Sequence, residues 1–262
     1  MRKMSRSEKA EKMIYGILAI ATFFLAWEFI TTFTAARETT PGPIQVIRLL
    51  FTSFFEPIGR FTIYGHLYYS LRRVLVGYTV AAVSGIIVGL SMGTSRYAEA
   101  IIKPLFELIR PIPPIAWIPL VILWFGVGEL PKYAIIFIGS FTNITLNAYT
   151  GAQRVDPTLV GCARMLGTSE RDIFLRVILP SSLPQIFAGM QVALSTAWMA
   201  VLAAEMVGAQ EGCGWIILRG SDTTNIPLVL VGMVVIGVVG LVLATIMREA
   251  ERRLCSWNRM DV

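Results

Sequence analysis

The composition of the chain excludes an ordinary water-soluble protein. Of its 262 residues, 55% are apolar and only 15% are charged, and the mean hydropathy is +0.66, whereas soluble domains carry about 25% charged residues. The 23 Lys and Arg residues exceed the 17 acidic residues by 6 charges, but they fall between long apolar runs and form no single basic patch. We therefore expect a membrane protein, with membrane lipid as its surroundings and no nucleic acid as a partner.

Six apolar segments are long enough to cross a bilayer as helices, which takes about 20 residues. They are 13–36, 74–92, 111–128, 133–153, 181–204 and 223–247. Glu28 interrupts the first segment, and the other five contain no charge. The first segment follows a basic stretch, but its apolar run is longer than the core of a signal peptide and no small-residue cleavage site stands out. We expect it to be a retained helix.

The third segment is the least regular of the six. Pro111, Pro113, Pro114 and Pro119 punctuate it, and proline in a helix interior breaks or bends the helix. The alternative to a helix over 111–128 is therefore one that begins earlier, near Ala100, and bends at the prolines.

Small and polar residues within the spans indicate where helices meet. Gly77, Gly85 and Gly89 recur every four or eight residues and share one face of the second segment, which favours close approach of another helix. Asn143, Thr145 and Asn147 make the fourth segment unusually polar. They can line a solute path, and interhelical hydrogen bonds explain them equally well.

The Lys and Arg residues are unevenly divided between alternate connections. The N-terminal tail, 93–110, 154–180 and 248–262 carry 16 of them, and 37–73, 129–132 and 205–222 carry the other 7. Cytoplasmic connections carry the excess of Lys and Arg. This asymmetry predicts that both termini and the connection 154–180 are cytoplasmic.

Two connections are too long to be simple turns. In the outer one, residues 43–55 form an amphipathic pattern that predicts a helix lying along the interface. In the connection 154–180, apolar residues at helical spacing lie on both sides of Gly167. Glycine can end one helix, and Thr168 or Ser169 can cap the next. We expect a helix–turn–helix that docks on a partner and transmits its movement.

This helix–turn–helix resembles the signature of ABC importer permeases, E-A-A-x3-G-x9-I-x-L-P. Gly161, Cys162 and Val177 replace the usual Glu, Ala and Ile of the signature. The resemblance implies a coupling helix that docks on a separate ATPase subunit. The contact residues that it implies are Gly161, Ala163, Arg164, Met165, Leu166, Gly167, Leu179 and Pro180. The missing carboxylate at Gly161 removes one expected polar contact.

A second resemblance narrows the subfamily. The stretches PLFELIRPIPPIAWIPL at 104–120, WFGVGE at 124–129 and AAEM at 203–206 are similar to permeases for taurine, alkanesulfonates, nitrate and bicarbonate, the taurine type most of all. The resemblance implies an all-α type I permease fold with six transmembrane helices. It also implies a second copy of the chain, two cytoplasmic ATPase subunits and an external solute-binding protein, in the bacterial plasma (inner) membrane.

The resemblance also implies a division of the chain. Residues 1–36 are expected to form a cytoplasmic tail and the first helix, 37–65 an external segment with an interfacial helix, 66–250 the permease core of five helices, and 251–262 a cytoplasmic tail.

Candidate residues for the translocation pathway or gate lie within the spans or directly at the end of one. Glu205 ends the fifth span, and ionisable groups at membrane depth often line a water path. The candidates are Glu205, Asn143, Met199 and Trp117. Arg72 and Arg73 could attract an anion at the outer mouth, but anchoring to lipid headgroups is the stronger interpretation. His66 is expected to be exposed or locally hydrogen-bonded in an external connection.

No catalytic, metal-binding or cofactor-binding residues are expected. Cys162, Cys213 and Cys255 are far apart and His66 is the single histidine, so neither a disulfide framework nor a metal site is indicated. No G-x4-G-K-[ST] sequence occurs, so ATP hydrolysis belongs to a partner and the chain is not an enzyme. We expect an importer permease for a small anion; the alternative is a secondary transporter or channel that works without an ATPase, which the charge-free spans disfavour.

Overall fold

The computed structural model describes residues 6–33 and 40–255, and this part of the chain is helical, without a strand. The ends of the two predicted tails (1–5 and 256–262) and residues 34–39, where the first predicted span ends, lie outside the described residues. The elements are α1 Arg6–Phe33, α2 Pro43–Ser53, α3 Ile63–Thr94, α4 Arg96–Ile109, η2 Pro114–Trp117, α5 Ile118–Phe125, α6 Glu129–Gln153, α7 Pro157–Met165, α8 Glu170–Ile173, η3 Phe174–Ile178, α9 Leu179–Gly208, α10 Cys213–Asp222 and α11 Ile226–Leu254. Here η2 is a 3₁₀ helix and η3 a π-helix. The expected all-α fold is confirmed.

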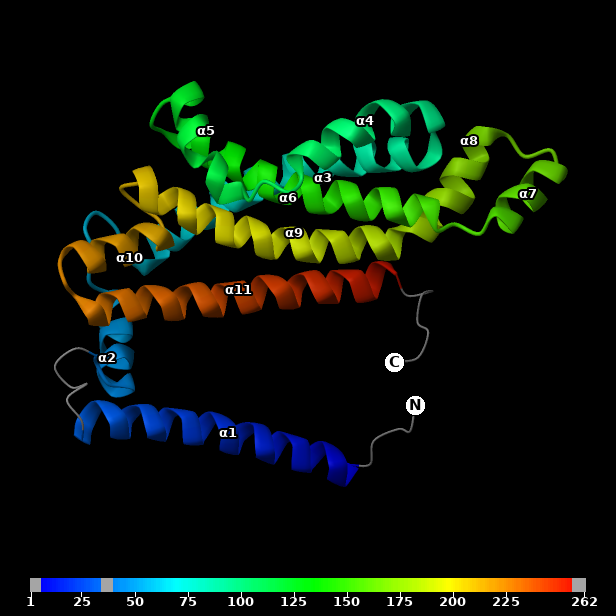
Figure 1. Cartoon of the computed structure of the whole chain (residues 1–262). Helices are drawn as coiled ribbons and strands as arrows, with labels where there is room; N and C mark the ends of the chain where they lie inside the picture. The colour runs from blue at the N-terminus through cyan, green and yellow to red at the C-terminus, as the bar shows by residue number, and fades with distance from the viewer. Residues whose placement is uncertain (1–5, 34–39, 256–262) are drawn as a thin grey trace.

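The core is built from α3, α6 and α9, which run side by side with α11 along their length (Figure 1). Glycines on α3 allow α6 to approach closely. A Cβ atom built on Gly77 would lie 2.8 Å from the Cβ of Ile136, and one on Gly89 would lie 2.4 Å from the carbonyl oxygen of Thr145. The predicted glycine face is therefore the face on which α6 packs.

Four helices of the described chain are long and apolar enough to cross a membrane: Met13–Phe33, Ile63–Thr94, Glu170–Gly208 and Ile226–Leu254. Helix α4 and the Pro114–Phe125 segment form a fifth candidate only as a pair bent by 85°. Helix α6 lies between α3 and α9. Because of its polar residues, α6 is less apolar than these four helices and is not among the candidate spans. The predicted count of six spans is therefore not confirmed.

The third predicted span, a helix over 111–128, is wrong. The chain leaves α4 at Ile109, breaks at its prolines and continues as η2 and the eight-residue α5, which is too short to cross a bilayer. The alternative is correct in outline, because a helix begins at Arg96 and the chain bends at Pro111–Pro113. Proline removes a backbone donor and clashes with the preceding turn, so a straight helix cannot pass through this stretch.

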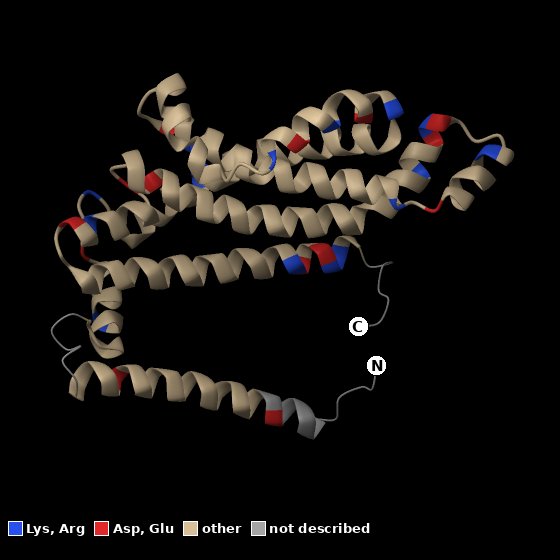
Figure 2. Cartoon of the chain, in the orientation of Figure 1, with Lys and Arg blue, Asp and Glu red and all other residues tan. Residues whose placement is uncertain are grey.

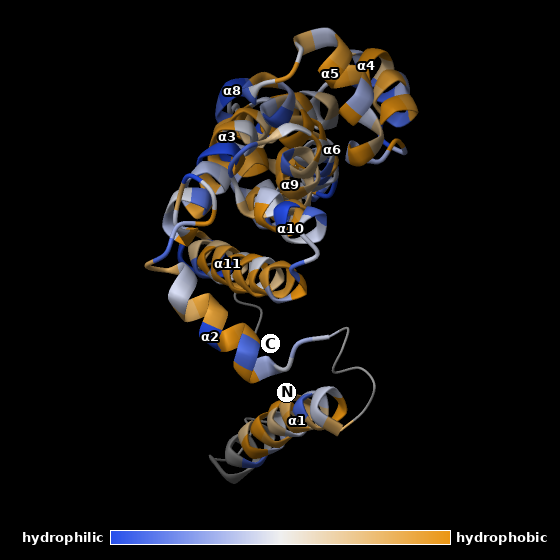
Figure 3. Cartoon of the chain, turned by 90° about the vertical axis from the view of Figure 1, so that its left-hand side faces the viewer, coloured by the Kyte–Doolittle hydropathy of each residue, from blue (hydrophilic) through white to orange (hydrophobic). Residues whose placement is uncertain are grey.

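Helix α1 lies apart from the other long helices and approaches them through α2 (Figures 1 and 3). None of its most apolar window is buried inside the chain. The predicted interfacial helix over 43–55 is α2, and it packs against α11 through residues that include the buried Val46. Figure 3 shows apolar colour along both α1 and α11.

On the long helices, charged residues gather toward the two ends and leave the middle almost free of charge, whereas the shorter α4 carries charges along its length (Figure 2). One end carries α7 and α8 together with the Leu254 end of α11 (Figure 1). The opposite end carries α5, α10 and the first turn of α6. Such a charge distribution is typical of a bundle whose middle lies in hydrocarbon.

Candidate functional site

Residues 154–180, here called the elbow, form a helical corner that projects beyond the ends of α6 and α9 (Figure 1). Asp156 caps α7 by accepting a 2.8 Å hydrogen bond from the backbone N–H of Thr158, which holds the pKa of that carboxyl below its usual range. Gly167 has φ +76°, and the N–H of Thr168 donates to the carbonyl of Ala163 at 3.1 Å. This left-handed residue ends α7. The predicted helix–turn–helix is therefore present.

The second half of the elbow joins directly to α9. Ser169, one of the two predicted capping residues, accepts a hydrogen bond from the N–H of Asp172 and so begins α8. Ile173 is completely buried and anchors the corner to the bundle. The π-helical turn η3 then leads into α9 without a loop, and Leu179 and Pro180 begin α9. The elbow and α9 are therefore continuous, with no loop between them.

The tip of the elbow presents apolar side chains to its surroundings. Met165 is 90% exposed and Leu166 is 84% exposed, and no atom lies within 4 Å of a Cβ built on Gly161 or Gly167. Beside them, Arg164 pairs with Glu170 at 2.8 Å across the turn, which raises the pKa of the arginine. An exposed apolar tip with a charged rim is the pattern of a protein interface.

An ion cluster of Arg73, Glu129, Lys132, Glu205 and Glu211 lies at the opposite end of the bundle. Neither Arg73 nor Glu205 has exposed side-chain surface, and their nearest N and O atoms are 2.8 Å apart. Glu205 comes from the last turns of α9, Glu129 begins α6, and Glu211 lies in the turn between α9 and α10. The cluster therefore joins four elements that are distant in sequence.

Side chains of α3 and α9 also hold the first turn of α10. The N–H of Gly212 donates to His66 Nδ1 at 3.0 Å, that of Cys213 to Ser70 Oγ at 2.8 Å, and that of Gly214 to Glu205 Oε2 at 2.9 Å. These are backbone donors that a helix start leaves without an intrahelical partner. Glu205 thus serves both the cluster and α10.

The structure corrects two expectations about the opposite end. His66 belongs to α3 and is fully buried; it is locally hydrogen-bonded, with Nε2 2.9 Å from the carbonyl of Ile58, but it is not exposed. Arg72 is exposed, whereas Arg73 is buried among carboxylates and reaches neither headgroups nor an external anion. The sequence places the two arginines together, and the helix turns them to different sides.

The remaining pathway candidates lie on α6, α9 and η2. The side-chain amide of Asn143 donates to Thr196 Oγ1 on α9 at 3.3 Å, and that of Gln185 donates to Asn147 Oδ1 at 2.8 Å. These are the interhelical hydrogen bonds that one of the two interpretations predicted. Met199 is 74% exposed on α9. The half-buried Trp117 packs beside α5 and α6, and its buried indole N–H has no acceptor among the described residues.

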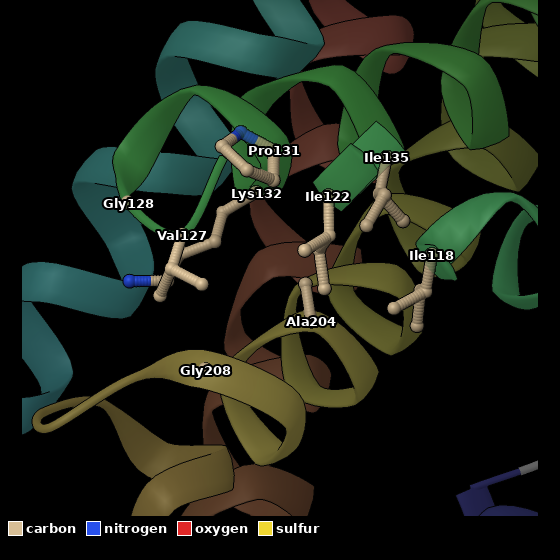
Figure 4. Close-up of a pocket in the computed structure, with 9 residues that line it drawn as sticks. All are labelled: Ile118, Ile122, Val127, Gly128, Pro131, Lys132, Ile135, Ala204 and Gly208. Carbon is tan, nitrogen blue, oxygen red and sulfur yellow. The ribbon is translucent and has the colours of Figure 1, made fainter. Parts of the chain in front are cut away.

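A small pocket lies between α5, the start of α6 and the end of α9 (Figure 4). It has a volume of about 10 Å³, enough for about one water molecule. Its lining is almost entirely apolar: Ile118, Ile122, Val127, Gly128, Pro131, Lys132, Ile135, Ala204 and Gly208. The Lys132 nitrogen points out of the pocket toward α3 (Figure 4) and pairs with Glu129 at 2.7 Å. The pocket is too small and too apolar to hold an organic anion.

Sequence reasoning missed the ion cluster as a unit. It selected Glu205 but did not pair it with Arg73, Glu129 or Glu211. The available signal was the position of Arg73, Glu129 and Glu205, each at the edge of a different charge-free run, with Glu211 in the connection that begins at Glu205. Opposite charges at the same predicted end of a bundle are candidates for pairing.

Long apolar helices with an exposed elbow at one end define an integral membrane protein. The chain belongs to the family of binding-protein-dependent transport system inner membrane components, whose family model matches residues 81–254. The members of this family are transport subunits of the inner membrane and not enzymes. This confirms the expectation of a membrane transport subunit and the expectation that the chain is not an enzyme.

Relatives extend the match over nearly the whole chain. It is 36% identical over 243 residues to "Probable ABC transporter permease protein" of Brucella abortus, covering 93% of this chain and 95% of the relative. It is 31% identical to the taurine transport system permease protein TauC of Escherichia coli K12 (95% and 91% covered). It is 30% identical to the nitrate import permease protein NrtB of a Synechocystis species (88% and 86% covered).

Solved structures share the fold at low sequence identity. An amino acid ABC transporter crystallised with histidines matches with a TM-score of 0.60 and 16% identity, covering 83% of this chain and 99% of the other. An inward-facing MetNI methionine ABC transporter matches with a TM-score of 0.57 and 18% identity, covering 71% and 93%. The type I importer permease fold expected from the sequence is confirmed.

Proposed function

We propose that this chain is the membrane permease of an ATP-driven importer for a small anion, with taurine or another alkanesulfonate first and nitrate or bicarbonate next. Two copies would form the pathway, two cytoplasmic ATPase subunits would bind the elbows, and an external binding protein would deliver the solute. The named relatives for taurine and nitrate support the anion class. The single observation that carries the proposal is the exposed apolar tip of the elbow at one end of α9.

The mechanism follows from the connection between the elbow and α9. When the ATPase subunits bind ATP and close, the two elbows are drawn together, and each α9 is displaced from the same end. The helices then rock between inward-open and outward-open states, which is a two-state equilibrium biased by nucleotide. In this scheme Glu205 acts at the outer gate, and Asn143, Met199 and Trp117 face or support the path.

The orientation of the chain rests on its charges. The connections that the sequence assigns to the same side as the elbow carry 16 of the 23 Lys and Arg residues, so the elbow and both termini are proposed to be cytoplasmic. The ion cluster is then at the external end, close to where a binding protein would release its solute.

The experiment that tests the proposal replaces Gly167 by valine. A β-branched residue is strongly disfavoured at positive φ, so Gly167→Val should distort the elbow. We expect the variant to reach the membrane, to lose co-purification with its ATPase and to lose ATP-dependent uptake of taurine. Gly237→Val is the control, because Gly237 lies on the exposed side of α11 with no atom within 4 Å of an added Cβ.

Uptake by the wild-type chain alone, independent of ATP, would instead favour a secondary transporter or channel. ATP-dependent uptake of nitrate or bicarbonate without taurine uptake would retain the importer and change the solute.

A further inference from the structure

All five N–H donors of the Arg73 guanidinium are used within the protein. Nε and Nη2 bind the two oxygens of Glu129 at 2.8 and 2.7 Å. Nη1 donates to Glu205 Oε1 at 2.8 Å and to the backbone carbonyl of Glu211 at 2.9 Å, and Nη2 also donates to Glu211 Oε1 at 2.7 Å. A guanidinium has five donors in a fixed planar fork. No donor remains for a transported anion.

The charges of the ion cluster also disfavour an anion site. Three carboxylates face two cations, because Lys132 is the second cation and pairs with Glu129. Glu129 and Glu211 lie at the outer edge of the cluster and retain some exposure, whereas the side chains of Arg73 and Glu205 lie inside it and have none. Burial of an arginine is costly unless it is fully paired. The arrangement therefore serves to hold protein elements together.

Helix α9 connects the ion cluster to the elbow. It runs for 30 residues from Leu179, where the elbow ends, to Gly208, just beyond Glu205, which is about 45 Å at the rise of an α-helix. At its far end Arg73 ties this helix to α3, to α6 and to the turn that starts α10. Without that tie, α9 could slide past its neighbours when it is displaced.

We infer that Arg73 is a positioning residue that holds the far ends of α3, α6, α9 and the α9–α10 turn as one rigid body. Movement of the elbow is then passed to the opposite end of the bundle through all of these elements together. The rigid body follows from the contacts alone; its use in transport rests on the proposed function.

Lysine cannot replace Arg73 in this role. An ammonium group has three donors on a flexible stem, whereas Arg73 uses four donors for the three carboxylates and its fifth for the backbone carbonyl of Glu211, all in one plane. We therefore expect Arg73→Lys to keep the charge but to hold fewer of the partners, with an effect between those of the wild type and Arg73→Gln.

The first test measures amide hydrogen exchange of the full chain in lipid nanodiscs. In Arg73→Gln, the amides of Gly212, Cys213 and Gly214 should exchange at least about tenfold faster, with smaller effects in Arg73→Lys and none in α11. Arg72→Gln is the matched control, since it removes the same charge from the adjacent exposed position. Unchanged exchange in Arg73→Gln would overturn the inference.

The second test measures coupling in proteoliposomes that contain the chain, its ATPase and its binding protein, with taurine as the probe. Arg73→Gln should assemble but hydrolyse several times more ATP per taurine imported than the wild type or Arg72→Gln. A wild-type ratio, despite faster exchange, would overturn the role in transmission and leave the proposed function intact. If Arg73→Gln does not assemble, the ratio of ATP hydrolysed to taurine imported is measured in Arg73→Lys and Glu211→Gln, which remove fewer contacts. The same increase in this ratio is then expected.

Absence of ATP-driven uptake by the wild-type complex would instead count against the proposed function. The hydrogen-exchange measurement would still decide whether Arg73 holds the four elements together.

Discussion

Arg73 on α3 and Glu205 on α9 form an ion pair of 2.8 Å in which neither side chain is exposed, although 132 positions separate them in the sequence. A pair of this kind is sensitive to removal of one partner, because the other is left as an uncompensated buried charge. It therefore makes the two helices dependent on each other at the end opposite the elbow.

Replacing Glu205 by alanine should destabilise the protein strongly. Breaking a buried ion pair costs about 3–5 kcal/mol, and Glu205→Ala also removes the acceptor of the Gly214 N–H. We expect a clear fall in the denaturation midpoint of the purified protein in detergent. Glu249→Ala, which breaks an exposed pair with Arg253, should leave the midpoint unchanged. Equal denaturation midpoints for Glu205→Ala and Glu249→Ala would contradict the conclusion that the Arg73–Glu205 pair is buried and stabilising.

Gly89→Val should disturb the packing of α3 on α6. An added Cβ at Gly89 would lie 2.4 Å from the carbonyl oxygen of Thr145 and 2.6 Å from the Cβ of Ala148. Because the nearest atom is backbone, it cannot move aside, and overpacking costs about 1–3 kcal/mol. Thermal unfolding should reveal the loss, whereas Gly237→Val, with open space around it, should unfold at the wild-type temperature.

Gly167→Asn should retain most of the binding to the ATPase that Gly167→Val loses. Asparagine tolerates the left-handed conformation that φ +76° requires, and a β-branched residue does not. Quantitative pull-down of the ATPase on each variant measures the difference. Similar losses with asparagine and valine would show that bulk at the tip, and not backbone conformation, decides binding.

Leu166→Asp should leave folding unchanged and abolish the pull-down of the ATPase. Leu166 is 84% exposed, so a charge there adds no burial cost to the free subunit but opposes burial in an apolar interface. The control is Phe55→Asp, because Phe55 is 85% exposed and lies just beyond the end of α2, which is at the end of the molecule opposite the elbow (Figure 1). An ATPase that binds Leu166→Asp normally would exclude the tip as the contact.

Cys162 should report the orientation of the elbow. It is exposed, whereas Cys213 and Cys255 are buried, so a thiol reagent should modify Cys162 first. A membrane-impermeant maleimide should label inside-out vesicles and spare intact spheroplasts. Cys162→Ala should abolish the signal. Labelling of spheroplasts would place the elbow outside and overturn the proposed orientation.

The elbow was predictable because its signals are local. Gly167 followed by Ser169 specifies a helix end and a helix start within three residues, and the structure uses both. The glycine face of α3 was predictable for the same reason, since helical periodicity places Gly77 and Gly89 on one side whatever packs there.

The ion cluster was not predictable in full because its members come from separate segments. That Arg73 turns inward and Arg72 outward depends on which side of α3 faces α6 and α9, and no local pattern at 72–73 encodes that choice. The bend at Pro111–Pro113 was anticipated only as an alternative, since proline can either kink a helix or end it. Its 85° angle follows from packing of η2 and α5 on α6 and α9.

Helix α1 illustrates a different kind of constraint. Because no part of its most apolar window is enclosed by the chain, its side chains need no complementary shape in a close-packed interior. Shuffling the order of its apolar residues between Met13 and Leu25 should leave the bundle intact, provided that the mean hydropathy of the segment is unchanged. This stretch of α1 is thus constrained by its composition, whereas the partners of Arg73 are constrained residue by residue.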